Sequence, residues 1–263
     1  MIVARKSPTV VIFRRGPSQW VQLIKWDTDT DTFELGQWFH GRIYEKRCDL
    51  SPDGSLLIYF AQKKATLWWT AISKPPFLTA LALWPKGQSW DGGGLFRDDK
   101  TILLNHDPSV AKPHPDKMPT RLHVILKEGG YGGDEPIFSE RLARDGWTLT
   151  QEWKGESLGL PYHFRTVQPE IREKSSGWRK IRMTRSRESG EKFAVVLGKG
   201  SLITIESAGW VDWDKKGRLI IAREGRISIG DIEDNGQLTE KTLIDLNTSK
   251  PKPLVAPQWA QTW

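Results

Sequence analysis

The chain has 263 residues, of which 38% are hydrophobic and 27% are charged. A chain of this length and composition can bury a large core, so it belongs with folded globular proteins and not with disordered ones. Lys and Arg outnumber Asp and Glu by 39 to 32, which gives a formal net charge of +7. This excess permits an acidic protein or a nucleic acid as partner without requiring either.

Cysteine content and hydropathy bear on the compartment in which the protein works. The single cysteine, Cys48, excludes an internal disulfide framework and a cysteine-based zinc cage. No apolar run approaches the length of a membrane span, and the "TVVIFRRG" of residues 9–16 is too short for a signal peptide. We therefore expect a cytoplasmic protein without a membrane partner.

Short segments rich in β-branched and apolar residues follow one another along the chain, separated by Asp, Gly, Pro and Asn. No long window shows helical periodicity. Such a series predicts an all-β protein, either a sandwich, a barrel or a propeller. The 14 tryptophans are consistent with aromatic-filled β layers or with an aromatic binding surface. The expected strands include residues 9–15, 20–26, 55–61, 66–72, 101–105, 121–127, 193–197, 201–205, 218–222 and 226–230.

Internal repetition favours the propeller. Residues 9–36, 55–81 and 217–240 share a plan of strand, tight turn, second strand, polar turn and third strand. A strand that ends in an Asp- or Gly-containing turn precedes the second and third of these units, in "CDLSPDG" and "GWVDWDKKG", and recurs in "GLFRDDK" before Thr101. A four-stranded meander repeated roughly every 40 to 50 residues is typical of propeller blades.

Two short motifs carry a family resemblance. The "SPDG" of residues 51–54, followed by an apolar strand, and the "KWD" of residues 25–27, which ends a strand, resemble the blade motifs of WD40-like and SPDG-type β-propellers. The Gly-His signature of WD40 repeats is missing, because "FHG" at residues 39–41 has the wrong order. The resemblance implies the propeller architecture without a specific family.

We predict one domain over residues 1–263 with five four-stranded blades, and a β-sandwich is the alternative fold. The first blade shows three strands, so we expect the tail "QWAQTW" to supply its missing strand and close the ring, which removes two free sheet edges. The expected blades cover residues 9–40 with 254–263, 41–84, 90–153, 160–207 and 209–246.

The acidic run "DTDTDT" at residues 27–32 looks like a calcium loop. An EF-hand loop needs glycine at its sixth position and a carboxylate at its twelfth, and counting from Asp27 these positions hold Thr32 and Trp38. Because Asp and Thr also cap backbone N–H groups in turns, we predict a turn between two strands.

Candidate catalytic chemistry is sparse. In the long insertion at residues 105–117, His106 and His114 could converge with Asp107 and Asp116 on a metal, but no regular element fixes their spacing. The alternative is a solvated loop that contacts a partner. Cys48 is interpreted as a buried structural thiol. The glycine-rich stretches at residues 91–96, 129–134 and 197–201 lack a phosphate-loop pattern. We therefore assign no catalytic residue, no metal and no cofactor.

The most prominent surface feature is the basic segment at residues 171–192. As a strand it would place Arg179, Ile181 and Met183 on one side and Lys180, Arg182 and Thr184 on the other. Three interpretations stay open: a solvated hairpin, a site for an acidic protein, or a nucleic-acid site with stacking on Trp178. Four acids, Glu170, Glu173, Glu188 and Glu191, favour the first. The candidate binding residues are Trp178, Arg179, Lys180, Arg182, Arg185 and Arg187, with His106 and His114.

Because propellers host many activities, the fold cannot choose the function. The hypothesis favoured by the sequence is a non-catalytic module that binds another protein. One alternative is a hydrolase that uses a metal or a carboxylate pair at the central opening of the propeller. The other is an aromatic-lined binder of sugar or nucleic acid.

Overall fold

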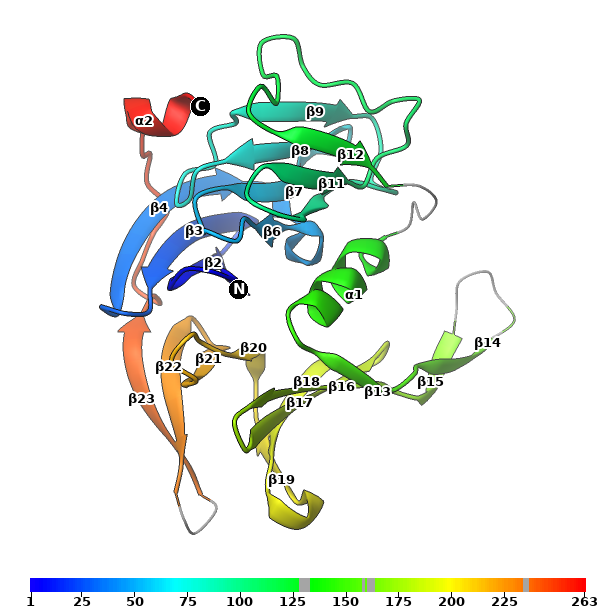
Figure 1. Ribbon diagram of the computed structural model, residues 1–263, viewed down its shortest axis with the longest axis vertical. Coiled ribbons are helices and arrows are strands. Elements are labelled where there is room, and N and C mark those ends of the chain that lie inside the picture. The colour runs from blue at the N-terminus through cyan, green and yellow to red at the C-terminus, as the bar shows by residue number, and fades with distance from the viewer. Residues whose placement is uncertain (128–132, 158, 160–163, 234–236) are drawn as a thin grey trace. The chain divides into compact units, whose positions relative to one another are not determined.

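The computed structural model describes residues 1–263 apart from 128–132, 158, 160–163 and 234–236. Strands predominate, so the prediction of an all-β protein is confirmed (Figure 1). Two α-helices accompany them, α1 (Glu135–Arg144) and α2 (Gln258–Gln261). Within the described residues, no helix is long and apolar enough to cross a lipid bilayer.

The chain divides into two compact units. Unit 1 comprises Met1–Arg141 and Ser249–Trp263, and unit 2 comprises Leu142–Thr248. Both are built from antiparallel sheets whose strands follow one another along the chain, except where stated below. The number of blades and the closure of a propeller stay predictions.

The first sheet of unit 1 is an antiparallel meander in the order β1-β2-β3-β4. Its three long strands lie where the sequence predicts them, within residues 9–40. The first two of them have consecutive buried residues, at 9–12 and 21–24, so both of their faces are covered there, whereas the third is mostly half-buried or exposed. The strands are β1 (Ile2–Val3), β2 (Thr9–Arg15), β3 (Trp20–Asp27) and β4 (Thr32–His40).

The fourth strand of this sheet comes from the start of the chain, which corrects the prediction for the tail. Ile2 pairs with Val11 and Val3 with Val10, so β1 occupies the free edge of β2. The tail instead forms helix α2, which begins after Pro257 and buries Ala260 against Phe77. A proline that fixes its own φ and is followed by good helix formers favours a helical turn over an added strand.

The second sheet of unit 1 lies within residues 41–86, close to the expected range. β5 and β6 pair with opposite ends of β7, and a 3₁₀ turn at Glu45–Arg47 separates them. The order continues through β8 to β9 as a meander. The strands are β5 (Arg42–Ile43), β6 (Asp49–Leu50), β7 (Leu57–Lys64), β8 (Leu67–Ser73) and β9 (Ala82–Lys86).

The third sheet of unit 1 differs from the four-stranded meander expected within residues 90–153. It has three strands, β10 (Gly94–Phe96), β11 (Thr101–Leu104) and β12 (His123–Leu126), and β12 runs parallel to β11. The loop at residues 105–122 makes the crossover that a parallel pair requires. Helix α1 follows, and the next strand, β13, belongs to a sheet of unit 2.

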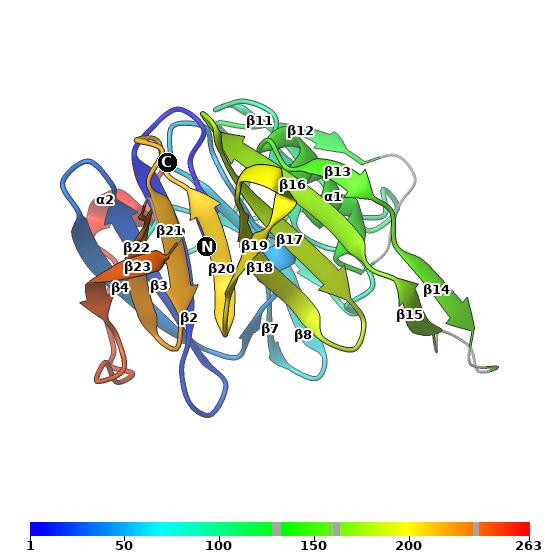
Figure 2. The same cartoon turned by 90° about the horizontal axis from the view of Figure 1, so that it is seen from below.

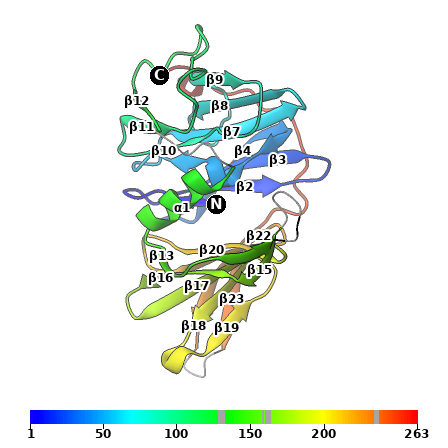
Figure 3. The same cartoon turned by 90° about the vertical axis from the view of Figure 1, so that its right-hand side faces the viewer.

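Unit 2 contains a five-stranded sheet in the order β13-β16-β17-β18-β19, whose last four strands run side by side (Figure 3). A separate hairpin, β14–β15, extends away from it (Figure 2). In the core of unit 2, three aromatic rings meet edge to face: Trp147, Phe193 and Trp210. The strands are β13 (Thr148–Gln151), β14 (Lys154–Ser157), β15 (Phe164–Gln168), β16 (Glu170–Ser176), β17 (Arg179–Ser186), β18 (Gly190–Val196) and β19 (Leu202–Ile205).

The other sheet of unit 2 is a four-stranded antiparallel meander that agrees with the strands expected over residues 209–246. Three consecutive residues of its second strand, Leu219, Ile220 and Ile221, are buried, so both faces of this strand are covered. The strands are β20 (Ala208–Trp213), β21 (Leu219–Arg223), β22 (Arg226–Ile232) and β23 (Leu238–Asp245).

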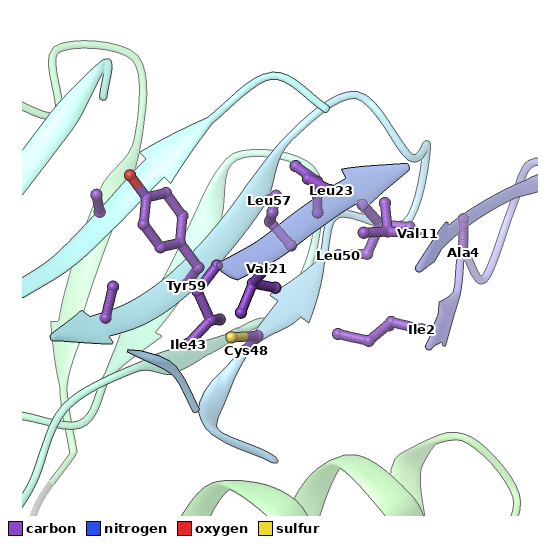
Figure 4. Packing of buried hydrophobic residues seen from close by; sticks show 12 residues of the cluster. Ile2, Ala4, Val11, Val21, Leu23, Ile43, Cys48, Leu50, Leu57 and Tyr59 are labelled. Carbon is purple, nitrogen blue, oxygen red and sulfur yellow. The ribbon is translucent and has the colours of Figure 1, made fainter. Parts of the chain in front are cut away.

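The largest part of the core of unit 1 lies between its first two sheets. Figure 4 shows Val11, Leu23, Leu50 and Leu57 gathered there with Cys48. The Cys48 side chain is fully buried, and its burial raises the pKa of the thiol to about 12. The interpretation of Cys48 as a buried thiol is confirmed.

The repeated Asp-containing motifs are one kind of turn. Asp53, Asp98 and Asp214 each follow the first strand of a hairpin, and each carboxylate accepts a hydrogen bond from the backbone N–H two residues later, at 2.8–2.9 Å. This geometry replaces one backbone hydrogen bond and reverses the chain tightly. The internal repetition seen in the sequence therefore reflects three equivalent turns, between β6 and β7, β10 and β11, and β20 and β21.

The "DTDTDT" run is also a turn, as predicted. It joins β3 to β4, and the Asp27 carboxylate accepts hydrogen bonds from the backbone N–H groups of Asp29 (2.8 Å) and Thr30 (3.1 Å). Asp31 adopts the left-handed conformation, with φ at 54°, which Asp tolerates better than most residues.

Candidate functional site

The basic segment forms the hairpin β16–β17 and the start of β18. Ile181 and Met183 are buried, and the register places Arg179 on their side of the sheet and Lys180 with Arg182 on the other. The predicted alternation is therefore confirmed. The strand period of two residues is sufficient to sort these side chains onto the two faces.

Acidic residues neutralise much of this basic segment. Glu173 pairs across the strands with Lys180 at 2.9 Å and with Arg182 at 2.8 Å. Burial alone would raise the pKa of Glu173, but the hydrogen bonds from these two cations hold it below its ordinary value. Arg182 is thus engaged within the sheet, as the solvated-hairpin interpretation requires.

A second ion-pair group lies at the other end of the same strands. Glu170 pairs with Arg172 at 2.8 Å and with Arg185 at 2.9 Å. Arg185 also reaches Glu191 at 3.4 Å. Two acids and two bases balance here, so this part of the hairpin offers little excess charge to a partner.

Trp178 stands apart from these ion pairs. It lies in the two-residue turn between β16 and β17, where Gly177 adopts φ +59°, and its side chain is 84% exposed. Large aromatic side chains usually bury most of their area, so an exposed tryptophan marks a place where another molecule can cover it.

Arg179 holds this turn against a second one. Its guanidinium donates to the carbonyl of Gly217 at 2.5 Å and lies 5.0 Å from the centre of the Trp213 ring. The turn that contains Trp178 therefore contacts the turn at residues 214–218, where Lys215 and Lys216 are exposed. We call Trp178, Arg179, Lys215 and Lys216 the Trp178 patch.

The acids near the Trp178 patch face inward. Asp214 is fully buried, and its carboxylate accepts from the Arg218 guanidinium at 2.6 Å and from the backbone N–H groups of Lys216 and Arg218. Asp212 is almost fully buried and pairs with Lys174 at 2.5 Å. These two carboxylates are turned into unit 2, so neither adds negative charge to the surface of the Trp178 patch.

Arg187, the remaining candidate of the basic segment, has an aromatic environment of its own. Its guanidinium lies 5.4 Å from the Trp153 ring and 5.2 Å from the Phe164 ring, at the base of the hairpin β14–β15. Such stacking fixes the arginine through cation–π attraction. Its role is to hold this hairpin to the sheet of unit 2.

The structure does not bring the two candidate histidines together. His106 is fully buried in unit 1, and its Nε2 lies 2.8 Å from the hydroxyl of Thr70. His114 is at the surface, with its Nδ1 3.9 Å from Asp116. Across the described part of the chain, no group of three or more His, Cys, Asp and Glu side chains is arranged to hold a metal ion. The stretch at residues 129–134 lies largely outside the described residues.

His106 belongs to a buried polar cluster that no sequence pattern predicts. Lys86 and Asp91 form an ion pair with side chains 2% and 1% exposed, and Asp91 also accepts from the backbone N–H of Asp107 at 2.8 Å. Burial, together with the charge of Lys86, lowers the pKa of His106 to about 3, although Asp91 opposes this. The histidine is therefore neutral. The side chains of this cluster are almost fully buried.

Sequence reasoning missed Lys215 and Lys216 as companions of Trp178. In sequence they are part of an ordinary turn, 37 or more residues away from Trp178. The hydrogen bond from Arg179 to Gly217 brings the two turns together, and no spacing rule in the sequence predicts it.

Comparisons with known proteins add little. No protein-family model matches the chain, and no curated protein matches it. Among solved structures, the β-propeller domain of the Trilobed protease from Pyrococcus furiosus is 10% identical, with a TM-score of 0.30, over 89% of this chain and 66% of that one.

Two other solved structures show a similar degree of likeness. An uncharacterised protein from Listeria monocytogenes is 10% identical, with a TM-score of 0.34, over 95% of this chain and 83% of its own. A putative 6-phosphogluconolactonase from Bacteroides fragilis is 11% identical, with a TM-score of 0.27, over 88% and 92%. TM-scores this low establish neither a shared fold nor a shared function.

Proposed function

We propose that this chain is a non-catalytic β-propeller-type module that binds an acidic protein through the Trp178 patch. Its consecutive antiparallel strands, joined by equivalent Asp turns, support the propeller architecture. The observation that carries the binding function is the 84% exposure of Trp178 beside Arg179, Lys215 and Lys216.

The tryptophan supplies the affinity in this proposal. Covering its exposed apolar area would contribute roughly 3–4 kcal/mol before the costs of association. Tryptophan and arginine dominate the binding energy of many protein interfaces, and such residues cluster in a small central area. The ion pairs of β16 and β17 keep the strands beneath the patch rigid, so little conformational entropy is lost on binding.

The lysines supply the selectivity for an acidic partner. Asp212 and Asp214 are turned inward and paired, so a carboxylate that approaches Lys215 and Lys216 meets no opposing charge from them. Complementary charge raises the association rate more than it raises the affinity, and salt screens the effect. Binding through this patch is therefore expected to weaken as the salt concentration rises.

The test is a pull-down from a lysate of the native host, followed by titration of the purified partner. Trp178→Ala is expected to weaken binding about thirtyfold, because a hot-spot tryptophan contributes about 2 kcal/mol. Lys215→Glu with Lys216→Glu is expected to weaken binding chiefly through the association rate. Trp90→Ala is the matched control, since Trp90 is also exposed (59%) but lies in unit 1.

The outcomes separate the alternatives. A protein retained by the wild type and by Trp90→Ala, but lost by both patch variants, supports the proposal. Retention of the same proteins by Trp178→Ala contradicts it. Capture of nucleic acid in place of an acidic protein would contradict the choice of partner and favour the nucleic-acid alternative.

A further inference from the structure

A pocket of about 560 Å³ opens on unit 1, and several of its lining residues are basic. Val21, which belongs to the core shown in Figure 4, also lines it. Three turns form it: the β2–β3 turn, the link from β4 to β5, and the end of the β7–β8 hairpin. The volume lies within the range of natural small-molecule sites.

Four cations line this pocket: Arg15, Arg42, Lys63 and Lys64. None of the residues that line it is acidic. Glu45, a neighbour outside the lining, holds Arg15 through two hydrogen bonds of 2.7 and 3.0 Å. In the described part of the chain, Lys63 and Lys64 have no carboxylate partner. The pocket therefore carries an excess of about three positive charges, which an anion would neutralise.

Several polar groups of the pocket are already oriented. The Arg42 guanidinium lies 4.5 Å from the centre of the Tyr44 ring, and the Tyr44 hydroxyl donates to Oε1 of Gln62 at 2.9 Å. This hydrogen bond fixes the Gln62 amide and leaves its Nε2 group as a donor. An arginine placed by stacking and an amide with a fixed direction suit recognition of phosphate oxygens.

An aromatic side chain borders the same space. Trp20 lines the pocket, and its ring stacks on His40 with centroids 4.7 Å apart and planes 25° apart. Trp38 meets Trp20 edge to face at 6.5 Å, so the indole is held on two sides. A tryptophan fixed in this way can contact the organic part of a bound phosphate compound.

The backbone at the rim makes a tight turn. Ser18 and Gln19 adopt φ values of 51° and 66°, two consecutive left-handed residues that are not glycine. Gly41, with φ +154°, donates its N–H to the carbonyl of Gln19 at 2.9 Å, and a Cβ there would lie 2.6 Å from the Phe39 ring. Positive φ at both central residues is what a tight hairpin turn requires, and with the close approach of Gly41 it fixes the shape of the rim.

From these features we infer that the pocket binds a small compound that carries a phosphate group. Lys63, Lys64 and Arg42 would neutralise the phosphate, Gln62 would donate to it, and Trp20 would contact the rest of the molecule. This site is independent of the Trp178 patch, which lies in unit 2.

The probes are adenosine monophosphate, inorganic phosphate and adenosine, added to protein that contains fluorotryptophan. Fluorine NMR reports each tryptophan separately, and Trp20→Phe identifies the Trp20 resonance by its loss. We expect adenosine monophosphate to move this resonance, adenosine to leave it in place, and inorganic phosphate to compete with adenosine monophosphate for the site. Lys63→Glu with Lys64→Glu, at a hairpin end, is expected to weaken binding of adenosine monophosphate about tenfold.

The matched control, Arg97→Glu with Lys100→Glu, makes the same charge change at another exposed site of unit 1 and is expected to bind like the wild type. Equal weakening in the control would overturn the proposal, because it would show attraction by net charge alone. A Trp20 resonance that adenosine monophosphate does not move, or that adenosine moves equally, would also overturn it. If the double variant no longer gives the dispersed spectrum of a folded protein, Arg42→Gln tests the same site in its place.

Discussion

At the residue scale, His106 shows how burial changes the chemistry of a side chain. Its Nδ1 has no hydrogen-bond partner among the described residues, and Nε2 faces the Thr70 hydroxyl. Protonation would place a charge in this site beside Lys86, so the folded protein keeps the imidazole neutral to a pKa of about 3.

The stability of the protein is therefore expected to fall as the pH is lowered from about 6.5 to about 3. In this window the unfolded chain binds a proton at His106 and the folded chain does not, so protonation favours unfolding. The loss approaches about 1.4 kcal/mol per pH unit. Urea denaturation at several pH values measures it.

His106→Asn should reduce this pH dependence, whatever its effect on stability at neutral pH. The exposed His114 provides the control, since His114→Asn should leave the slope unchanged. An equal slope in the wild type and in His106→Asn would contradict the assignment to His106.

Residue-scale features divide into those the sequence could predict and those it could not. The burial of Cys48 follows from the preference of unreactive thiols for the core, and the alternation of Arg179 to Thr184 follows from strand periodicity. The pairing of Lys86 with Asp91 does not, because these residues meet through the fold of a loop. Likewise, the charge run at residues 171–192 suggested a basic surface, while cross-strand glutamates neutralise much of it.

At the element scale, the Asp turns are the units that repeat. Their three carboxylates make the same backbone hydrogen bond but differ in burial, because Asp214 is buried and Asp98 is exposed. The contribution of such a turn to stability should therefore depend on its surroundings and not on the motif alone.

Asp214→Ala is expected to lower the free energy of unfolding by about 2–3 kcal/mol, because it leaves Arg218 and two backbone N–H groups without their buried acceptor. Asp98→Ala should have a much smaller effect, since water can replace its carboxylate. Thermal and urea denaturation of the two variants give the comparison. Equal losses would show that the turn acts through local geometry alone.

The elements that the sequence missed have identifiable causes. Helix α1 is ten residues long, and the buried Arg141, which donates to the carbonyl of Glu45 at 3.0 Å, interrupts its apolar face. The parallel pairing of β12 with β11 depends on a crossover loop, whose path is not encoded in local periodicity. Strands with a short continuous apolar run bounded by turn residues, such as β2, β3 and β21, were predicted well because the run and the buried residues coincide.

At the scale of the whole molecule, unit 1 is completed by residues distant in sequence. Ala256 and Ala260 are buried with Phe77, and the Trp259 ring meets Phe77 edge to face at 5.5 Å. The Lys74 ammonium donates to the carbonyls of Trp259 and Thr262, each at 2.8 Å. The tail thus stabilises unit 1 without adding the strand that the sequence analysis predicted for it.

Removal of residues 256–263 is expected to destabilise unit 1 by about 2 kcal/mol, because it removes Ala256 and Ala260 and thereby exposes Phe77. Urea denaturation of a chain that ends at Val255 tests this. Trp259→Ala should reproduce only part of the loss, since half of this side chain is already exposed. An unchanged midpoint for the shortened chain would show that the tail contributes nothing to unit 1.

The discontinuity of unit 1 has a consequence for how the chain is made. A ribosome synthesises residues 142–248 before it adds Ser249–Trp263, so all of unit 2 precedes the last piece of unit 1. Until that piece arrives, Phe77 and its neighbours lack their cover, while every strand of unit 2 already exists. Domains generally fold as units during synthesis. Part of the core of unit 1 therefore stays incomplete until the last residues have been synthesised, whereas unit 2 can form its native contacts before then.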